Sequence, residues 1–346
     1  MKGKTGKMGR RRFLHLAGGT LAGAGMAGCL PHVEGEWGSC QDEEPQLEPP
    51  ASSRVVEVHA AAAIYQSGGQ SQVDATVVAA MWRAGLTALL DVADEAAAWP
   101  LLLPGYQPGQ GVGLKVNALN SMVPTRPELV NAVAESLTGP GGVAAGDVFV
   151  WDRTGRELER AGLGAAGLPV ASLGTVRSSS DESGPGYRQQ ASCLSGRQIR
   201  LSSLLTDRCR HLLNLAVCKN HFAAGFTGCL KNHYGSFANP YDYHDGCEQH
   251  IARLNALPEI VSVSRLFVLD ALRAVTQGDT DKPPDAEPCR LLLGLDPVAV
   301  DQRGLELRDE VRAAAGLEAG APAGYLEVAE GLGLGSRTYR LVSVEL

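Results

Sequence analysis

The segment from Cys218 to Gly235, CKNHFAAGFTGCLKNHYG, concentrates side chains that could do chemistry. Lys219 and Lys231 carry positive charge in an otherwise acidic body, three glycines permit tight turns that expose backbone amides, and Thr227 supplies a neutral donor. This mixture suits an oxyanion, either a carboxylate or a phosphate. The same residue types favour a glycine-rich connection with solvated lysines equally, so both interpretations stay open.

Two common fingerprints of nucleotide binding and catalysis are absent from the chain. No Gly-x-x-x-x-Gly-Lys-Ser/Thr run exists, which excludes a P-loop. Gly-x-Ser-x-Gly is also missing, so the signature of serine hydrolases is not present. Gly-x-Gly-x-x-Gly occurs at Gly23–Gly28 and at Gly162–Gly167, but this pattern alone is too weak to indicate a dinucleotide-binding domain.

The elements that must position these side chains alternate between strand and helix from residue 54 onward. Apolar runs predict strands at 55–58, 111–117, 148–151, 212–217, 266–269, 291–293 and 339–344. Helical spacing predicts helices at 77–90 with Asp74 as N-cap, at 125–137 opened by the capping box Thr125-Arg126-Pro127-Glu128, and after Asp296-Pro297. This order predicts a mostly parallel central sheet with helices on both faces, a three-layer α/β fold. Residues 153–200 are rich in Gly and Ser and are expected to form an irregular insertion.

Polar side chains end the predicted strands. They are Lys115 and Asn117, Asp152, Lys219 and His221, Asp270, and Asp296. Ligands of open α/β sheets bind beyond the carboxyl ends of the strands, so we expect this set to face one edge of the sheet. For any single member, loop capping is the commoner role, and only the set as a whole predicts a site.

The run Lys-x-His, then Thr-Gly-x-x-Lys-Asn and a later Gly, resembles the family called domain of unknown function 362. The matching residues are Lys219, His221, Thr227, Gly228, Lys231, Asn232 and Gly235. Further pieces that follow the family's order are Lys115-Val116-Asn117, Thr125-Arg126-Pro127-Glu128 with Arg126 in place of His, Asp152, Asp270, and Asp296-Pro297-Val298-Ala299-Val300-Asp301. The resemblance spans most of residues 54–305.

The resemblance implies a shared site without a settled reaction. Val217 stands where the family often has a second lysine, which implies weaker binding or a different ligand. Some relatives carry ferredoxin-like cysteine runs and are described as iron–sulfur proteins. This chain has no Cys-x-x-Cys, so that cluster is not expected here. The cofactor therefore stays unknown.

Cysteines and histidines leave a second question open. With Cys29 set aside as a lipid site, seven of the eight Cys remain. The cysteines from Cys193 to Cys289 are numerous enough for up to three disulfides, whose pairing the sequence does not determine. The pairs Cys218/His221, Cys229/His233 and Cys247/His250 have spacings compatible with shared transition-metal ligation. The alternative, buried cysteines beside surface or strand-end histidines, is favoured because no known finger spacing is matched.

Residues 1–29 have the layout of an export signal, with six bases, no acid and a short run of small apolar residues. Arg10-Arg11-Arg12-Phe13-Leu14 resembles the twin-arginine motif, and Met26-Ala27-Gly28-Cys29 resembles a lipobox. The partner expected for this segment is the twin-arginine export machinery. The expected destination is the periplasm, either free or as a lipoprotein anchored at the membrane.

Removal of these bases takes the net charge from −7 to about −13, which disfavours nucleic-acid binding. Residues 30–53 lack Lys and Arg, contain several Pro and acids, and are predicted to form an extended tether before a single α/β domain at 54–346. No apolar run of about 18 residues occurs beyond the N-terminus, so an integral membrane protein is excluded and contact with the membrane is expected only through the signal or a lipid.

Two functions follow from this pattern. In the first, an exported and redox-associated enzyme uses His221 as acid, base or ligand, oriented by Asp152, Asp270 or Asp296. The ligand-binding residues, for a small anionic ligand or cofactor, are Lys115, Asn117, Lys219, Thr227, Gly228, Lys231, Asn232, Asp296 and Asp301. In the second, a non-catalytic tethered protein uses the same pocket for binding or assembly. Both require that these distant residues share one crevice.

Overall fold

The computed structural model describes residues 38–41, 47, 53–176 and 186–346. The expected signal segment and most of the expected tether lie outside these ranges. The main sheet has the strand order β13-β1-β12-β11-β9-β4-β5-β6, with β10 paired to β9. Its strands are β1 (Arg54–His59), β4 (Gly111–Lys115), β5 (Val148–Thr154), β6 (Ala171–Val176), β9 (Cys209–His221), β10 (Gly225–Thr227), β11 (Ser264–Val275), β12 (Arg290–Gly294) and β13 (Arg340–Glu345).

Strand direction decides which residues share an edge. The strands β11, β9, β4, β5 and β6 are parallel, so their carboxyl ends lie together. Strand β12 is antiparallel to both of its neighbours, β1 and β11. Asp296, which follows β12, therefore lies at the opposite edge. The expectation that Asp296 joins the other strand ends is wrong, because a buried antiparallel strand has the same apolar run as a parallel one.

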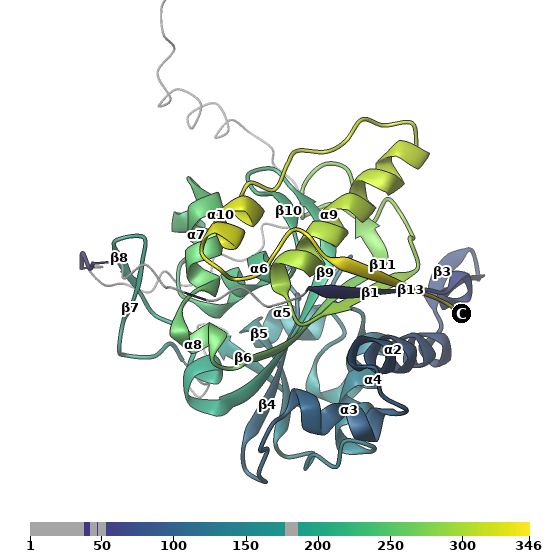
Figure 1. Ribbon diagram of the computed structural model, residues 1–346, viewed down its shortest axis with the longest axis horizontal. Helices are drawn as coiled ribbons and strands as arrows, with labels where there is room; N and C mark the ends of the chain where they lie inside the picture. The colour runs from purple at the N-terminus through teal and green to yellow at the C-terminus, as the bar shows by residue number, and fades with distance from the viewer. Residues whose placement is uncertain (1–37, 42–46, 48–52, 177–185) are drawn as a thin grey trace, which may run out of the picture. The chain divides into compact units, whose positions relative to one another are not determined.

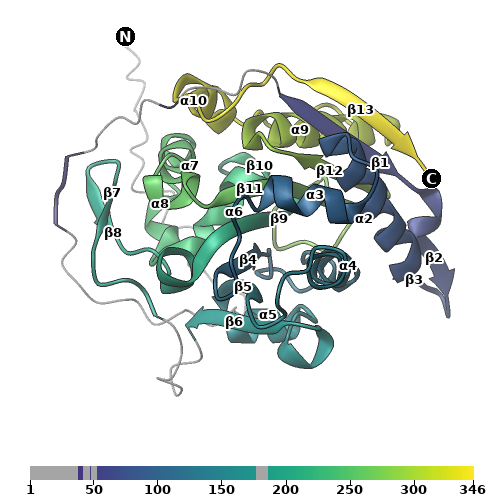
Figure 2. The ribbon, with the colours of Figure 1, turned by 60° about the horizontal axis from the view of Figure 1, so that its bottom comes forward.

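Helices cover both faces of the sheet, which confirms the predicted three-layer α/β fold (Figure 1; Figure 2). One face carries α2 (Ala75–Leu90), α3 (Glu95–Leu102), α4 (Pro127–Thr138) and α5 (Gly155–Arg160), and the other carries α6 (Cys229–Asn232), α7 (Cys247–Asn255), α8 (Pro258–Val261), α9 (Pro297–Ala314) and α10 (Tyr325–Gly331). Alternate residues of a strand enter different cores, as period-two geometry requires. Val56 and Val58 pack in one core with Trp82, whereas Val55 packs in the other with Val298.

The helix starts are only partly as predicted. Asp74 caps α2 by accepting from the amides of Thr76 and Val77, as expected. The capping box at Thr125 does not form. Its hydroxyl instead donates to the carbonyl of Leu215 at 2.7 Å, and Asp270 of β11 accepts from the amide of Arg126 at 2.7 Å. A carboxylate from the sheet thus satisfies the helix end that a local cap would serve.

The segment 153–200 is more regular than predicted. Helix α5 and strand β6 continue the alternation, since β6 is the edge strand beside β5. The hairpin of β7 (Ser192–Leu194) and β8 (Arg197–Ile199) follows, and a second hairpin joins β2 (Ile64–Ser67) to β3 (Gln70–Val73). The shorter turns are η2 (Ala61–Ala63), η3 (Ala165–Gly167), η4 (Leu204–Arg208), η5 (His233–Ser236) and η6 (Pro240–Tyr243).

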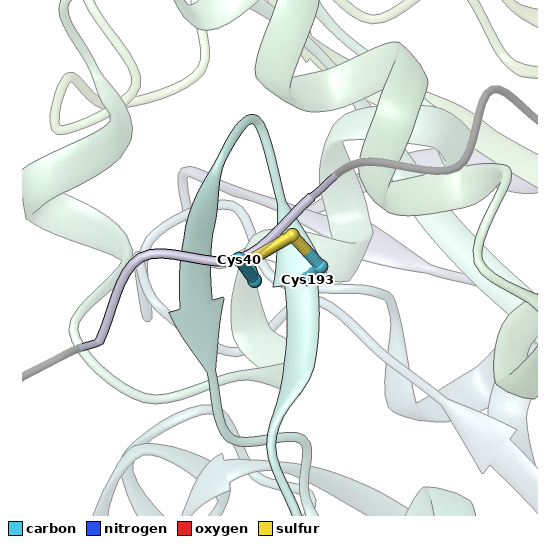
Figure 3. The surroundings of a disulfide bond; sticks show 2 residues. All are labelled: Cys40 and Cys193. Atoms are coloured by element: carbon cyan, nitrogen blue, oxygen red, sulfur yellow. A yellow bond between two sulfur atoms is a disulfide. The ribbon is translucent and has the colours of Figure 1, made fainter.

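A disulfide joins Cys40 to Cys193 on the β7–β8 hairpin (Figure 3). The amide of Cys40 also donates to the carbonyl of Gly196 at 3.1 Å. The open possibility of disulfides within 193–289 is not realised, because Cys193 pairs outside that range and the remaining thiols there are free and buried, namely those of Cys209, Cys218, Cys229, Cys247 and Cys289. Within the described ranges, no single helix has the length and apolarity to cross a membrane. Helices α2 and α3 reach that length and apolarity only when taken together, and the chain bends by 58° between them.

Candidate functional site

A cavity of about 260 Å³ opens beyond the carboxyl ends of β4, β5 and β9. Among the predicted site residues, those that line it are Asn117, Asp152, Lys219, His221, Thr227, Lys231 and Asn232. The other lining residues are Leu119, Asn120, Arg153, Glu157, Phe222, Tyr234, Gly235, Pro240, Tyr241, His244 and Thr280. Residues more than 100 positions apart in the chain therefore meet in one crevice, as the parallel strand ends predict.

The β9–β10 hairpin places the first cation and a hydroxyl side by side, because Lys219 pairs with Thr227 across the two strands. The hairpin turns at Gly225, whose φ of +73° is unfavourable for other residues. A Cβ atom at Gly225 would also lie 2.0 Å from the carbonyl oxygen of Pro322. One of the three glycines expected to permit tight turns is thus required here by both backbone conformation and space.

Lys219 is almost wholly buried, with 1% of its surface exposed. Its Nζ donates to Oδ1 of Asn117 at 2.8 Å, and no described carboxylate lies within ion-pair distance of it. Burial lowers the pKa of Lys219 to about 7, although the charges of Asp152 and Asp270 oppose this shift. The ammonium therefore has one neutral partner and an incomplete set of acceptors.

Lys231 is 6% exposed and has still fewer partners. Its Nζ lies 3.8 Å from the centre of the Tyr234 ring, a cation–π contact. In the described parts of the chain, no oxygen accepts a hydrogen bond from this ammonium. Burial lowers the pKa of Lys231 to about 8. Two lysines of the cavity thus lack the carboxylate that normally accompanies a buried ammonium.

His221 is held as a neutral donor. Its Nδ1 accepts from the amides of Ala223 at 3.0 Å and Ala224 at 3.2 Å, so the ring proton resides on Nε2. Burial, the charge of Lys231 and the neighbouring His244 lower the pKa of His221 to about 3. No hydrogen bond joins it to Asp152 or Asp270, so the predicted orientation of His221 by an aspartate is not formed.

Asp152 lines the cavity with both oxygens already occupied. Oδ1 accepts from Nζ of Lys115 at 2.8 Å, and Oδ2 accepts from the amide of Ala118 at 2.7 Å. Lys115 is fully buried behind Asp152 and does not reach the cavity. Asn232 extends this network, because its Oδ1 accepts from Nδ2 of Asn117 at 3.2 Å. The charges of Lys115 and Asp152 therefore neutralise each other, and the pair forms part of the buried wall of the cavity.

The remaining predicted site residues lie outside the cavity and bond to backbone amides elsewhere or make room for such bonds. Asp270 accepts from the amides of Arg126 and Leu272, and Asp301 accepts from those of Cys229 and Leu230 at 2.6 and 3.0 Å. Gly228 makes room for Asp301, since a Cβ there would lie 2.2 Å from Oδ1. Asp296 caps α9 at the far edge. Burial raises the pKa of Asp270 to about 6 and that of Asp301 to about 7.

The family model described as Domain of unknown function (DUF362) matches residues 112–306, more than half of the chain. The chain belongs to this family. The matched span runs from β4 into α9 and includes every residue that lines the cavity of this DUF362 protein.

No curated protein sequence matches the DUF362 chain. A crystal structure of a Thermotoga maritima protein aligns with 77% of this chain at 10% identity and a TM-score of 0.37. This chain spans 61% of that protein's length.

Sequence reasoning missed the aromatic side of the DUF362 cavity. Phe222, Tyr241 and His244 line it, and the rings of Phe222 and His244 are parallel within 3°. The signal for Phe222 is its position directly after the Lys-x-His motif. Tyr241 and His244 belong to no motif, and only the fold brings them to the site.

The proposed metal-ligand pairs do not assemble. In the described ranges, no three side chains of His, Cys, Asp or Glu are arranged to hold a metal ion. Cys229 donates to the carbonyl of Val268, and burial raises the pKa of the Cys218 thiol to about 12. His250 bonds to the hydroxyl of Ser195 at 2.8 Å. These cysteines pack in the core, as the alternative interpretation favours.

Proposed function

We propose that this DUF362 protein binds a small anion, a carboxylate or a phosphate, in the cavity beyond β4, β5 and β9. The observation that carries the proposal is the pair Lys219 and Lys231, both buried and both without a described carboxylate partner. Desolvating an ammonium costs several kcal/mol, as the lowered pKa values of the lysines reflect. An anion in the cavity offsets that cost.

The neutral groups of the cavity support the same ligand. Oγ1 of Thr227 is buried without a hydrogen-bond partner, and Nε2–H of His221 is a donor. The acids of the cavity are already paired, Asp152 with Lys115 and Glu157 with Arg153. Donors thus exceed free acceptors, which favours an acceptor-only ligand over an amine or a cation.

Calorimetric titration with inorganic phosphate and with acetate tests the proposal. We expect wild type to bind at least one of them, and the Lys219→Met/Lys231→Met double variant to lose about 100-fold or more in affinity. The matched control is Lys282→Met, since Lys282 is exposed and pairs with Asp281 outside the cavity. Absence of binding in wild type, or equal affinity in the double variant, contradicts the proposal.

A second candidate function is proton transfer to or from a bound acid, favoured by the pKa of about 7 at Lys219. A lysine with such a pKa is partly unprotonated near neutrality and can act as a base. His221 is less suited to this role, because its Nδ1 lone pair is occupied. Deuterium exchange into pyruvate, followed by NMR, tests this function. Catalysis is supported if wild type exchanges the pyruvate protons and the Lys219→Met variant does not. Equal exchange in both proteins contradicts a role of Lys219. A redox role stays a prediction from the family resemblance.

The export route is also part of the proposal. Twin-arginine translocation followed by lipid attachment at Cys29 is supported by the motif at residues 10–14 and by the Cys40–Cys193 disulfide, since disulfides persist in oxidising compartments. We expect Arg10→Lys/Arg11→Lys to retain the protein in the cytoplasm and Cys29→Ser to release it from the membrane fraction. Unchanged fractionation of both variants contradicts this route.

A further inference from the structure

Large apolar side chains stand exposed around the mouth of the cavity. Phe222 is 72% exposed, Tyr241 is 81% exposed and Leu119 is 53% exposed. They come from separate segments, the β9–β10 turn, η6 and the loop after β4, and all line the cavity. A single exposed apolar residue is ordinary, but three around one concave site mark a surface that a ligand covers.

The rings at this mouth share one orientation. His221 lies 5.0 Å from Phe222 and 5.6 Å from His244 between ring centres, with interplanar angles of 17° and 19°. The rings of Phe222 and His244 are 6.4 Å apart and differ by 3°. A flat group stacked on one of these rings is therefore parallel to the others, which is the arrangement that offset stacking requires.

Hydrogen bonds hold the two imidazoles of this ring cluster in place. Nδ1 of His221 accepts from the backbone of the turn, and Nδ1 of His244 lies 3.2 Å from the carbonyl of Pro240 and 3.3 Å from that of Tyr241. Because the imidazoles are fixed before a ligand arrives, stacking on them costs little conformational entropy.

The cationic floor of the cavity and its aromatic mouth together define an amphipathic ligand. We infer that the ligand is a planar aromatic or heteroaromatic acid whose carboxylate or phosphate reaches Lys219 and Lys231 while its ring stacks at Phe222 and His244. This inference rests on the proposed anion binding and names the ligand class. The volume of about 260 Å³ lies below the range of about 300–1,000 Å³ for drug-sized ligands. It therefore favours one ring system with one acidic group.

Matched pairs of acids isolate the contribution of the ring. Benzoate and cyclohexanecarboxylate carry the same charge on a flat and a puckered ring, and phenyl phosphate and cyclohexyl phosphate do the same for a phosphate. Calorimetric titration of wild type should show the flat member of the preferred pair binding about tenfold more tightly, the lower part of the range for stacking on an aromatic side chain. Comparison of the two pairs identifies the acidic group.

Substitutions at the mouth locate the preference. Phe222→Leu keeps an apolar side chain but removes the flat face, so the flat and puckered acids should then bind almost equally. Phe222→Ala should have the same effect on the ratio and should also weaken both acids. Tyr65→Ala is the control, because Tyr65 is an exposed tyrosine of β2 that does not line the cavity. Phe222 is largely exposed, so these variants are expected to fold.

The outcomes separate this inference from the proposal beneath it. Equal binding of flat and puckered acids by wild type, with loss of both in the double lysine variant, overturns the ring inference and leaves anion binding intact. A flat-ring preference that persists in Phe222→Leu and Phe222→Ala overturns stacking at this mouth. Binding of none of the four acids, nor of phosphate or acetate, overturns both.

Discussion

Two sets of buried charged residues lie close together in this protein, and their surroundings differ in kind. Asp270 and Asp301 are as buried as Lys219 and Lys231, but each aspartate accepts from two backbone amides. The lysines have only an amide oxygen and an aromatic face as partners. Buried polar groups are normally satisfied, so the satisfied set builds the architecture and the unsatisfied set indicates the ligand.

The satisfied set connects distant parts of the chain. Asp270 of β11 bonds to the start of α4, and Asp301 of α9 bonds to the start of α6, which carries Lys231. Asp301 thereby positions the helix of Lys231, and neither carboxylate lines the cavity. Variants of the two sets should therefore separate stability from binding.

The largest effect is expected for Asp301→Ala. The change leaves the amides of Cys229 and Leu230 and the hydroxyl of Tyr325 without their acceptor in the core. We expect the free energy of unfolding in urea to fall by about 3 kcal/mol or more. Asp281→Ala, at an exposed position, is the control and should change it little. A loss below about 1 kcal/mol contradicts an architectural role for Asp301.

Lys231→Met should show the opposite pattern. The variant removes a desolvated charge and keeps apolar volume beside Tyr234, so the free energy of unfolding should stay constant or rise. Affinity for the preferred anion should fall about 30-fold, the value of one charge-assisted hydrogen bond. Urea unfolding and calorimetry on the same preparation measure both. A destabilised variant with undiminished affinity would place Lys231 in the architectural set.

The pH dependence should carry opposite signs for the two sets. The raised pKa values of Asp270 and Asp301, about 6 and about 7, stabilise the fold at low pH, and this contribution is lost as pH rises through those values. The lowered pKa values of Lys219 and Lys231, about 7 and about 8, give a contribution that is present above the unfolded pKa and is lost as pH falls through the folded values.

Anion affinity needs charged lysines, so it should fall by about 100-fold or more between pH 6 and pH 9, because both ammonium groups lose their protons in that interval. Titration in buffers of different ionisation enthalpy should detect proton uptake on binding near pH 8. In Lys231→Met the fall should be smaller, because only Lys219, with a pKa of about 7, still titrates in the cavity. Affinity that is constant over this range would show that neither ammonium contacts the anion.

Thr227→Val should give the smallest effect and the finest distinction. Oγ1 of Thr227 is buried without a partner, so its replacement by a methyl group should raise the free energy of unfolding by about 1 kcal/mol. Affinity for the anion should fall about fivefold, because one neutral donor is lost. Thermal unfolding with and without ligand measures both changes. Lower stability without ligand would mean that the hydroxyl belongs to the architectural set.

Much of this arrangement is predictable from the residues. The alternating apolar runs at 111–117, 148–151 and 212–217 predict parallel strands, and that placement alone brings Asn117, Asp152 and Lys219 to one edge. The failures are equally specific. The run at 291–293 predicts a strand but not its direction, because a strand buried on both faces has the same pattern in either orientation. The apolar pattern therefore predicts the wrong edge for Asp296.

The sequence by itself determined the α/β layers, the edge at which the site lies and the residue types that meet there, because hydrophobic periodicity and strand-end polarity are local properties. Only the tertiary structure decided which of those polar groups find partners. Aspartate accepts from a backbone amide as readily as it serves a ligand, so Asp152, Asp270 and Asp301 are alike in sequence and differ only in the distant groups that the fold brings within 3 Å. His221 differs from the aspartates, because its partners are nearby amides of its own turn, yet these reach its Nδ1 only once the hairpin has closed.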